Sequence, residues 1–274
     1  MSRPSQALRA YYASADEDQR LVRQNIARLE FDTTVHCLAP YLEGAGTLTE
    51  LGAATGRYAL YYAQQGLQVT ALEPVPELVA QLRSKARQHA DQGRPLPLVI
   101  QQGNAMAVDG IEAQSQDAVL VLGPLYHLQR ESDRNKVMQQ AKRILKPGGV
   151  LAIAYISRFF VAGLMAKQLG SELTPALLTE LYQTGLVSSP KVDPFFRIGY
   201  FATPEEMAQL ARDSGFTLEA HIATDGHARL MGEAINALNE DQYQAWLAHH
   251  LASCAEPSLL GASNHGLVIA RKAS

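Results

Sequence analysis

The stretch Glu50-Leu51-Gly52-Ala53-Ala54-Thr55-Gly56-Arg57 decides the fold class of this chain. It follows a short β-prone segment, residues 47–51, and precedes a helical segment that begins at Tyr58. Glycines in such a turn let the backbone bend tightly and let a ligand approach closely, while the first turn of the helix offers unpaired N–H groups. The stretch therefore predicts a strand–turn–helix unit that can bind a ligand.

The alternation of strand and helix continues beyond this turn. We expect further strands at 68–73, 96–101, 118–122, 150–156, 216–222 and 267–270. Helices are expected at 58–65, 76–92, 132–145 and 204–213, and residues 1–45 have helical character. Strands that alternate with helices are typical of right-handed βαβ units and a parallel sheet. Residues 157–202 and 224–263 interrupt the alternation, so we interpret them as helical lids over a ligand crevice.

Composition bounds the kind of protein. The chain has 274 residues, 47% apolar and 19% charged, and its 24 basic and 27 acidic side chains give a net charge of −3. Such a chain has no broad positive field for nucleic acid or anionic membrane. Neither a secretory signal nor an apolar run of the ~18–20 residues needed for a membrane span is evident, so we expect a soluble, cytoplasmic protein. Cys37 and Cys254 lie far apart in sequence, from which we exclude a disulfide framework and a zinc ribbon.

Two further strand ends carry polar residues suited to a nucleoside. Glu73 ends the second strand, where a carboxylate can accept both hydroxyls of an adenosine ribose. Asn104 follows the third strand, where its amide can bond the edge of a purine. Each residue taken alone is more often an ordinary turn residue. A dinucleotide fingerprint needs glycines where Ala54 and Arg57 stand, and the G-K-[ST] sequence of a P-loop is absent, which disfavours both of those classes.

Together these motifs resemble the class I S-adenosylmethionine-dependent methyltransferases. The matching stretches are residues 50–56, Glu73, 103–105, 117–122 and the Pro-Gly-Gly turn within 145–151. Residues 123–128, Gly-Pro-Leu-Tyr-His-Leu, further resemble a bacterial subgroup that methylates small molecules. The chain departs from the family pattern at Ala54, where glycine is usual, and at Asn104, where aspartate is common.

The resemblance implies an α/β fold: a Rossmann-like, doubly wound seven-stranded sheet whose last strand is antiparallel, with helical lid insertions. It implies one domain over 1–274, with a cap at 1–45, a cofactor-binding core at 46–156 and the two lids. The implied cofactor is S-adenosyl-L-methionine, which leaves as S-adenosyl-L-homocysteine. The residues expected to bind it are Tyr12, Glu50, Gly52, Ala53, Ala54, Gly56, Glu73, Pro74, Asn104, Ala105, Met106, Leu122 and Gly123.

The geometry of such a sheet also predicts where a methyl acceptor binds. Parallel strands end at the ligand edge and an antiparallel strand begins there, so residues after strands four and five and before strand seven should converge. The residues expected to contact the acceptor are Arg20, Tyr126, Arg158, Phe159, Phe195, Phe196, Arg197 and Tyr200. His127 and His265 are the candidate catalytic bases, because histidine titrates near neutral pH. An aromatic pocket with arginines suits a small, partly planar or apolar molecule that bears an anionic group.

Each of these residues also has a structural interpretation. His127 could pack or cap the following helix, His265 could be a surface residue, and Arg158 could be a counter-ion for an acidic lid residue. The adjacent pair His249-His250 is a poor metal site, and we expect no metal. We therefore expect a methyltransferase that acts on a small metabolite and that could form a homodimer. The alternatives are a protein or nucleic-acid acceptor, a nucleotide-dependent oxidoreductase, or a non-catalytic S-adenosylmethionine-binding protein.

Overall fold

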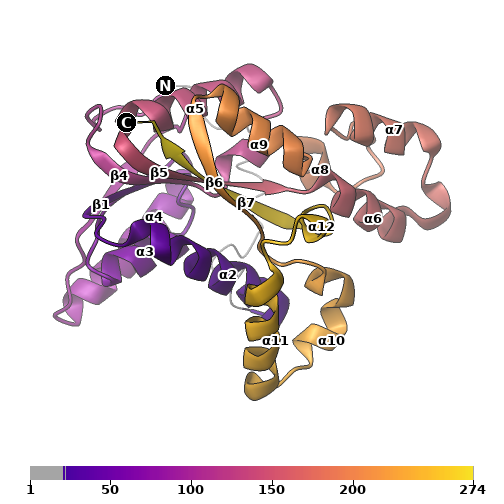
Figure 1. The fold of residues 1–274 in the computed structure, drawn as a ribbon, viewed down its shortest axis with the longest axis horizontal. Coiled ribbons are helices and arrows are strands. Elements are labelled where there is room, and N and C mark those ends of the chain that lie inside the picture. Colours follow the sequence, from indigo (N-terminus) through magenta and orange to yellow (C-terminus); the bar gives the residue numbers. More distant parts are fainter. Residues whose placement is uncertain (1–20, 22, 274) are drawn as a thin grey trace.

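A seven-stranded mixed sheet runs through the centre of the molecule (Figure 1). The structure is a computed structural model that describes residue 21 and residues 23–273. Its strands are β1 (Thr47–Leu51), β2 (Gln68–Glu73), β3 (Leu98–Gln102), β4 (Gln116–Val121), β5 (Leu145–Ile156), β6 (Phe216–Ala223) and β7 (His265–Lys272). They lie in the order β3-β2-β1-β4-β5-β7-β6, and β7 is antiparallel to both of its neighbours. The expected fold class, with its last strand antiparallel, is confirmed.

Helices cover both faces of the sheet because alternate strand residues point to opposite sides. In β4, Val119 and Val121 join one apolar core, whereas Ala118 and Leu120 join the other. The first core includes residues of α5 (Glu131–Ile144) and α9 (Pro204–Asp213). The second includes residues of α2 (Asn25–Leu42), α3 (Arg57–Gln64) and α4 (Pro76–Asp91). Figure 1 shows α5 and α9 above the sheet and α2 and α3 below it.

The Pro-Gly-Gly turn lies inside β5 and not before it. The helix expected at 132–145 ends at Ile144, and Leu145 already pairs with Gln116 of β4. The pairing resumes only at Ala118 and Val150, so the intervening residues form a bulge. Gly148 has a φ of +74°, the left-handed conformation that glycine adopts without cost.

The two insertions are helical, as expected. The first contains α6 (Arg158–Leu169), a short 3-10 turn (Gly170–Glu172), α7 (Pro175–Thr184) and α8 (Pro194–Ile198). It has a small apolar core of its own and projects away from the sheet (Figure 1). The second contains the 3-10 turn η3 (Ala228–Met231), α10 (Gly232–Asn236), α11 (Glu240–Ser253) and α12 (Pro257–Leu260). Its residues pack against Leu29 of α2. Within the described part of the chain, no helix has both the length and the apolar character needed to cross a bilayer.

The two cysteines meet in the fold despite their separation in sequence. Cys37 lies on α2 and Cys254 follows α11, and their Sγ atoms are 3.8 Å apart as free thiols. Distance along the chain is therefore no ground for excluding a link between them. The packing of α2 against the second insertion brings them together, and no local sequence pattern reports that packing.

Candidate functional site

The turn after β1 folds back across the end of β2. The N–H groups of Gly52 and Ala53 both donate to the carbonyl of Leu72, at 2.7 and 3.1 Å. Gly52 has a φ of +79°, and a Cβ at this position would lie 2.6 Å from the Pro124 side chain. Ala54 has a φ of +47°, so it adopts the conformation that the glycine usual at this position takes freely. The turn keeps its shape with alanine there, at a cost in local strain.

Two buried carboxylates lie against this turn. Glu73, at the end of β2, accepts the N–H of Ala54 through one oxygen and the N–H of Val75 through the other, both at 2.9 Å. Glu50, at the carboxyl end of β1, is 3% exposed, and its Oε2 has no hydrogen-bond partner within the described residues. Burial raises the pKa of Glu50 to about 8, opposed by the N–H of Ala59 and assisted by the charge of Glu73.

Asn104 closes the same site from β3. Its Oδ1 accepts the N–H of Met106 at 2.9 Å, and the N–H of Gly103 donates to the carbonyl of Glu73 at 3.1 Å. Other expected cofactor residues lie on the turns that follow β2, β3 and β4: Pro74, Ala105, Met106, Leu122 and Gly123. Tyr12 lies outside the described residues.

This set of residues fits an adenosylated sulfonium cofactor. Glu73 stands at the end of β2, where a carboxylate can accept ribose hydroxyls. The partnerless Oε2 of Glu50 supplies an acceptor, or a negative charge, for a cationic group. Val75 and Ala105, both buried, add apolar surface beside the two carboxylates.

Tyr126 lies between the glycine turn and a separate cavity. A Cβ built on Gly123 would lie 3.6 Å from both the Gly52 carbonyl oxygen and the Tyr126 hydroxyl oxygen. Tyr126 belongs to the 3-10 turn η1 (Pro124–His127) and also lines a cavity of about 260 Å³. The cavity therefore opens beside the place where the cofactor turn approaches the end of β4.

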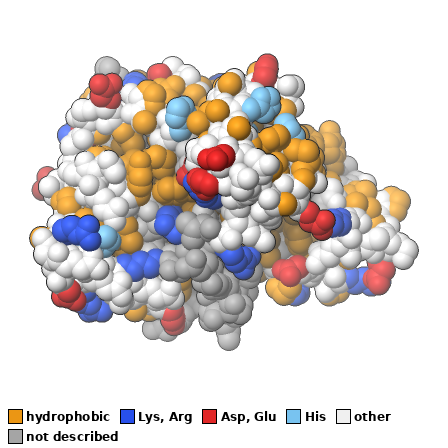
Figure 2. Space-filling view, turned by 90° about the horizontal axis from the view of Figure 1, so that it is seen from below, with side chains coloured by type: hydrophobic (Ala, Val, Ile, Leu, Met, Phe, Trp, Pro, Cys, Tyr) orange, Lys and Arg blue, Asp and Glu red, His pale blue; other side chains and the backbone are white. Residues whose placement is uncertain are grey.

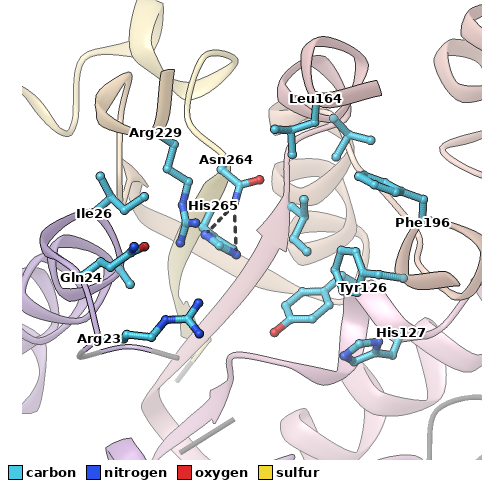
Figure 3. Close-up of a pocket in the computed structure, with 14 residues that line it drawn as sticks. Arg23, Gln24, Ile26, Tyr126, His127, Leu164, Phe196, Arg229, Asn264 and His265 are labelled. Atoms are coloured by element: carbon cyan, nitrogen blue, oxygen red, sulfur yellow. Dashed lines mark hydrogen bonds between the residues drawn. The ribbon is translucent and has the colours of Figure 1, made fainter. Parts of the chain in front are cut away.

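The cavity has a mainly polar wall and a mainly apolar, aromatic wall (Figure 3). In the close-up, Arg23, Gln24, Ile26, Arg229, Asn264 and His265 lie on one side, and Tyr126, His127, Leu164 and Phe196 lie on the other. The complete lining is Arg23, Gln24, Ile26, Ala27, Tyr126, His127, Ile156, Val161, Leu164, Phe195, Phe196, Arg229, Asn264 and His265. Of the residues expected to converge at the ends of strands four, five and seven, Tyr126, His127, Asn264 and His265 line this pocket, whereas Arg158 does not. Phe195 and Phe196 of the first insertion line it as well.

A cluster of charged groups supports the polar wall. Asp225 follows β6, its side chain is fully buried, and its Oδ2 lies 2.6 Å from Arg229 Nε and 2.9 Å from His265 Nδ1. Glu30 of α2 places its Oε2 3.2 Å from Arg229 Nη2 and 3.1 Å from the same His265 nitrogen. Burial by itself raises the pKa of Asp225, but Arg229, His265 and Ser263 together lower that pKa far below its ordinary value. Asp225 is therefore a carboxylate at neutral pH.

The donor atoms of Glu30, Asp225 and His265 lie within 4.8 Å of one another, a spacing that a metal ion could use. This cluster, which brings together three distant parts of the chain, was not foreseen from the sequence. The oxygens concerned already accept from the guanidinium of Arg229. The geometry is that of an ion-pair cluster with a cation in place.

Four residues expected in the acceptor site lie elsewhere. Arg158 is buried and donates to the carbonyls of Phe201 (2.9 Å) and Tyr182 (2.7 Å) and to Glu206 (2.7 Å). It anchors the first insertion and does not line the cavity, which agrees with its interpretation as a counter-ion.

Phe159 is exposed on α6 and Arg197 is exposed on α8, and neither lines the cavity. The ring of Tyr200 is buried beneath Arg134, whose guanidinium carbon lies 3.6 Å from the ring centroid. Tyr200 lines a different surface hollow. These positions differ from expectation because the first insertion turns part of its surface away from the sheet edge. Arg20 lies outside the described residues.

The sequence analysis missed the residues that the first turn of α2 and the loop after β6 contribute. Arg23 and Gln24 precede α2, and no motif marks them. Asp225 and Arg229 carry a usable signal, however. β6 is parallel to β5, because both are antiparallel to β7, so its carboxyl end lies at the same edge. The sequence analysis assigned residues that follow strands four and five, or precede strand seven, to the ligand edge. The same reasoning for strand six would have included Asp225.

Comparisons with known proteins agree with this geometry. Residues 49–153 match the family model of a methyltransferase domain. The chain is 29% identical over 216 residues to a ubiquinone biosynthesis O-methyltransferase of Xanthomonas axonopodis pv. citri, covering 78% of each chain. It is 25% identical over 132 residues to a putative methyltransferase of Bacillus subtilis, covering 48% of this chain and 51% of that one. A crystal structure of a methyltransferase from Methanosarcina mazei matches the fold with a TM-score of 0.58 at 17% identity, covering 86% of this chain and 97% of that chain.

Proposed function

Because the chain belongs to the class I S-adenosylmethionine-dependent methyltransferases, we propose that it methylates a hydroxyl group on a small molecule that combines an apolar or aromatic part with an anionic group. The observation that carries the proposal is the cavity beside the glycine turn, which has an aromatic wall opposite a wall with two arginines. The oxygen acceptor is supported by the similarity to an O-methyltransferase and by the histidines in the cavity lining.

The residues of the first site would hold the cofactor. Glu73 would accept the ribose hydroxyls, Asn104 would lie at the adenine edge, and the turn at Gly52 would lie along the aminoacyl part. When bound, S-adenosylmethionine supplies a methyl group on a positively charged sulfur, which makes the sulfur an excellent leaving group. The protein then contributes mainly proximity and orientation.

The cavity would orient the acceptor. The rings of Tyr126, Phe195 and Phe196 would pack against its apolar part, and Arg23 would face its anionic group. A hydroxyl held near the Tyr126 side would lie closest to the glycine turn. His127 or His265 would take the proton that the hydroxyl loses.

A macromolecular acceptor is less well supported. A cavity of about 260 Å³ is near the lower end of the usual range for small-molecule sites, ~300 Å³. The face drawn in Figure 2 mixes positive, negative and hydrophobic side chains, unlike the continuous basic track that nucleic acid requires. The proposal includes a cytoplasmic location and a possible homodimer, which cell fractionation and sedimentation test.

A matched set of acceptors tests the proposal. S-adenosylhomocysteine formation is measured with 3,4-dihydroxybenzoate, its amino and thiol counterparts, its uncharged methyl ester, and benzoate as the compound without a nucleophile. We expect turnover with the hydroxyl acid, and a rise in KM with the ester of about tenfold or more, as loss of a charged hydrogen bond implies. Turnover confined to the amine or thiol would overturn the hydroxyl assignment.

Cofactor binding is tested separately by calorimetry with S-adenosylhomocysteine. We expect Glu73→Ala to abolish measurable binding, whereas Glu43→Ala, at an exposed position after α2, should bind as the wild type does. Equal binding by both variants would contradict the assignment of Glu73.

A further inference from the structure

We propose that Asp225 and Glu30 are positioning residues that hold His265 with its proton on Nδ1, so that Nε2 is the base for the acceptor hydroxyl. This inference rests on the proposed function and deepens it, because it selects between the two histidines of the cavity. It also explains the buried cluster of Glu30, Asp225 and Arg229, which cofactor binding does not require.

The contacts of the imidazole fix its tautomer. Nδ1 lies 2.9 Å from Asp225 Oδ2 and 3.1 Å from Glu30 Oε2, and both atoms can only accept when ionised. A neutral His265 must therefore carry its proton on Nδ1 to make either bond. The amide nitrogen of Asn264 lies 3.2 Å from Nδ1 and 3.5 Å from Nε2, so the two carboxylates alone fix the tautomer.

Asp225 is itself held in one orientation. Its Oδ1 accepts the hydroxyl of Ser263 at 2.7 Å and the backbone N–H of His265 at 3.1 Å. Its Oδ2 is left for Arg229 and the His265 ring. The carboxylate therefore presents a defined oxygen to Nδ1, in the manner of the aspartate that orients histidine in a serine hydrolase triad.

The groups in contact with the His265 ring carry more negative than positive charge. Glu30 and Asp225 contribute two negative charges and Arg229 contributes one positive charge, so the group has a net charge of −1 when His265 is neutral. Among the described residues, the other charged or titratable groups that line the cavity are Arg23, Tyr126 and His127.

The proton-transfer step balances as follows. The acceptor O–H proton passes to Nε2, and the electron pair of that bond forms the new oxygen–carbon bond. The pair of the carbon–sulfur bond leaves with the sulfur. His265, now an imidazolium held by Asp225 and Glu30, returns its proton to water after the product leaves.

His127 lies in the opposite wall of the cavity, in different surroundings from His265. Its ring lies against aromatic neighbours, with centroids 4.7 Å from Tyr126 and 6.4 Å from Phe195. This environment suits packing against the apolar part of an acceptor. The geometry thus separates the two histidines by role.

The tautomer can be measured without knowing the acceptor. Protein labelled with ¹⁵N in its histidines is saturated with S-adenosylhomocysteine, and long-range ¹H–¹⁵N spectra are recorded at a pH where the ring is neutral. His265→Gln identifies the signals of His265. We expect an Nδ1–H ring in the wild type; an Nε2–H ring would overturn the proposal by itself.

A second test measures the His265 tautomer after substitution of Asp225 by asparagine. Because Oδ1 is already fixed by Ser263 and the His265 backbone, the new amide nitrogen would replace Oδ2 and donate to Nδ1. The double variant Asp225→Asn/Glu30→Gln also removes the charge of the other acceptor. We expect the double variant to shift the ring toward Nε2–H, while Asp109→Asn, at an exposed loop position, leaves the spectrum unchanged.

Kinetics with 3,4-dihydroxybenzoate complete the test. We expect His265→Gln and Asp225→Asn each to lower kcat by about 10² or more, with S-adenosylhomocysteine affinity unchanged, and His127→Gln to act mainly on KM. Wild-type kcat in Asp225→Asn overturns the positioning role while the methyltransferase assignment stands. Absence of turnover with every acceptor of the set refutes the proposed function instead, and the wild-type spectrum still decides the tautomer.

Discussion

Glu50 makes the stability of this protein depend on pH in a way that one substitution should remove. The side chain is 3% exposed at the end of β1, and its Oε2 has no partner within the described residues. Burial raises its pKa from 4.5 to about 8. The folded protein must therefore either hold a proton there or bury an unpaired charge. Glu50→Gln keeps the size of the side chain and cannot ionise.

The magnitude follows from the two pKa values. Between pH 4.5 and 8 the folded state binds more protons at Glu50 than the unfolded state does, so the free energy of unfolding falls as pH rises. One pKa unit corresponds to ~1.4 kcal/mol, so the wild type should lose about 2.5 kcal/mol from this group between pH 5 and pH 7. The variant should lose none of it.

The assay is denaturant unfolding of both proteins, without cofactor, at pH 5, 6, 7 and 8. Other titrating groups, such as His221, whose pKa burial lowers to about 4, affect both proteins alike and cancel in the difference. Glu43→Gln, at an exposed position, is the matched control. We expect the advantage of Glu50→Gln over wild type to grow with pH. Parallel curves across this range would refute the assignment of a protonated, buried Glu50.

Three further outcomes are expected. Gly266→Ala should destabilise the fold by ~1–3 kcal/mol, because its Cβ would collide with the Tyr155 ring; thermal unfolding measures this, and an unchanged Tm contradicts it. Ala54→Gly should not lower the Tm, because relief of the left-handed strain offsets the ~0.5–1 kcal/mol that glycine usually costs, and a clear drop would disprove the strain. Chelators should leave turnover unchanged, because Arg229 already occupies the carboxylate oxygens; activity lost with EDTA and restored by Mg²⁺ would reverse that reasoning.

Local patterns in the sequence were sufficient to predict the glycine turn and the strand ends that we assign to the cofactor. Period-two alternation fixes which strand residues face each helical layer, and Gly52 and Glu73 stand where parallel strands end. The capping box at Thr203 and Glu206 was also readable, and the structure contains both of its bonds, at 3.1 and 2.9 Å. Each of these features depends on residues a few positions apart or on the repeated strand–helix unit. They can therefore be predicted from one sequence.

The position of the lid residues could not be read in the same way. Arg158 has the same neighbours in sequence whether it faces an acceptor or the inside of its own insertion. Its role was decided when α7 and the segment at Phe201 placed two carbonyls around the guanidinium. A buried arginine takes whichever acceptors the packing provides, because leaving it unpaired is costly.

The sequence by itself determined the sheet, the glycine turn and the presence of two histidines at the edge of the sheet where the parallel strands end. Only the tertiary structure decided what surrounds His265, since Glu30, Asp225 and Arg229 come from α2 and from the loop after β6. Glu30 and Arg229 are 199 residues apart in the chain, yet their charged groups lie 3.2 Å apart. Electrostatic interactions act through space and not along the chain, so a charge cluster of this kind is settled only when the helices pack against the sheet.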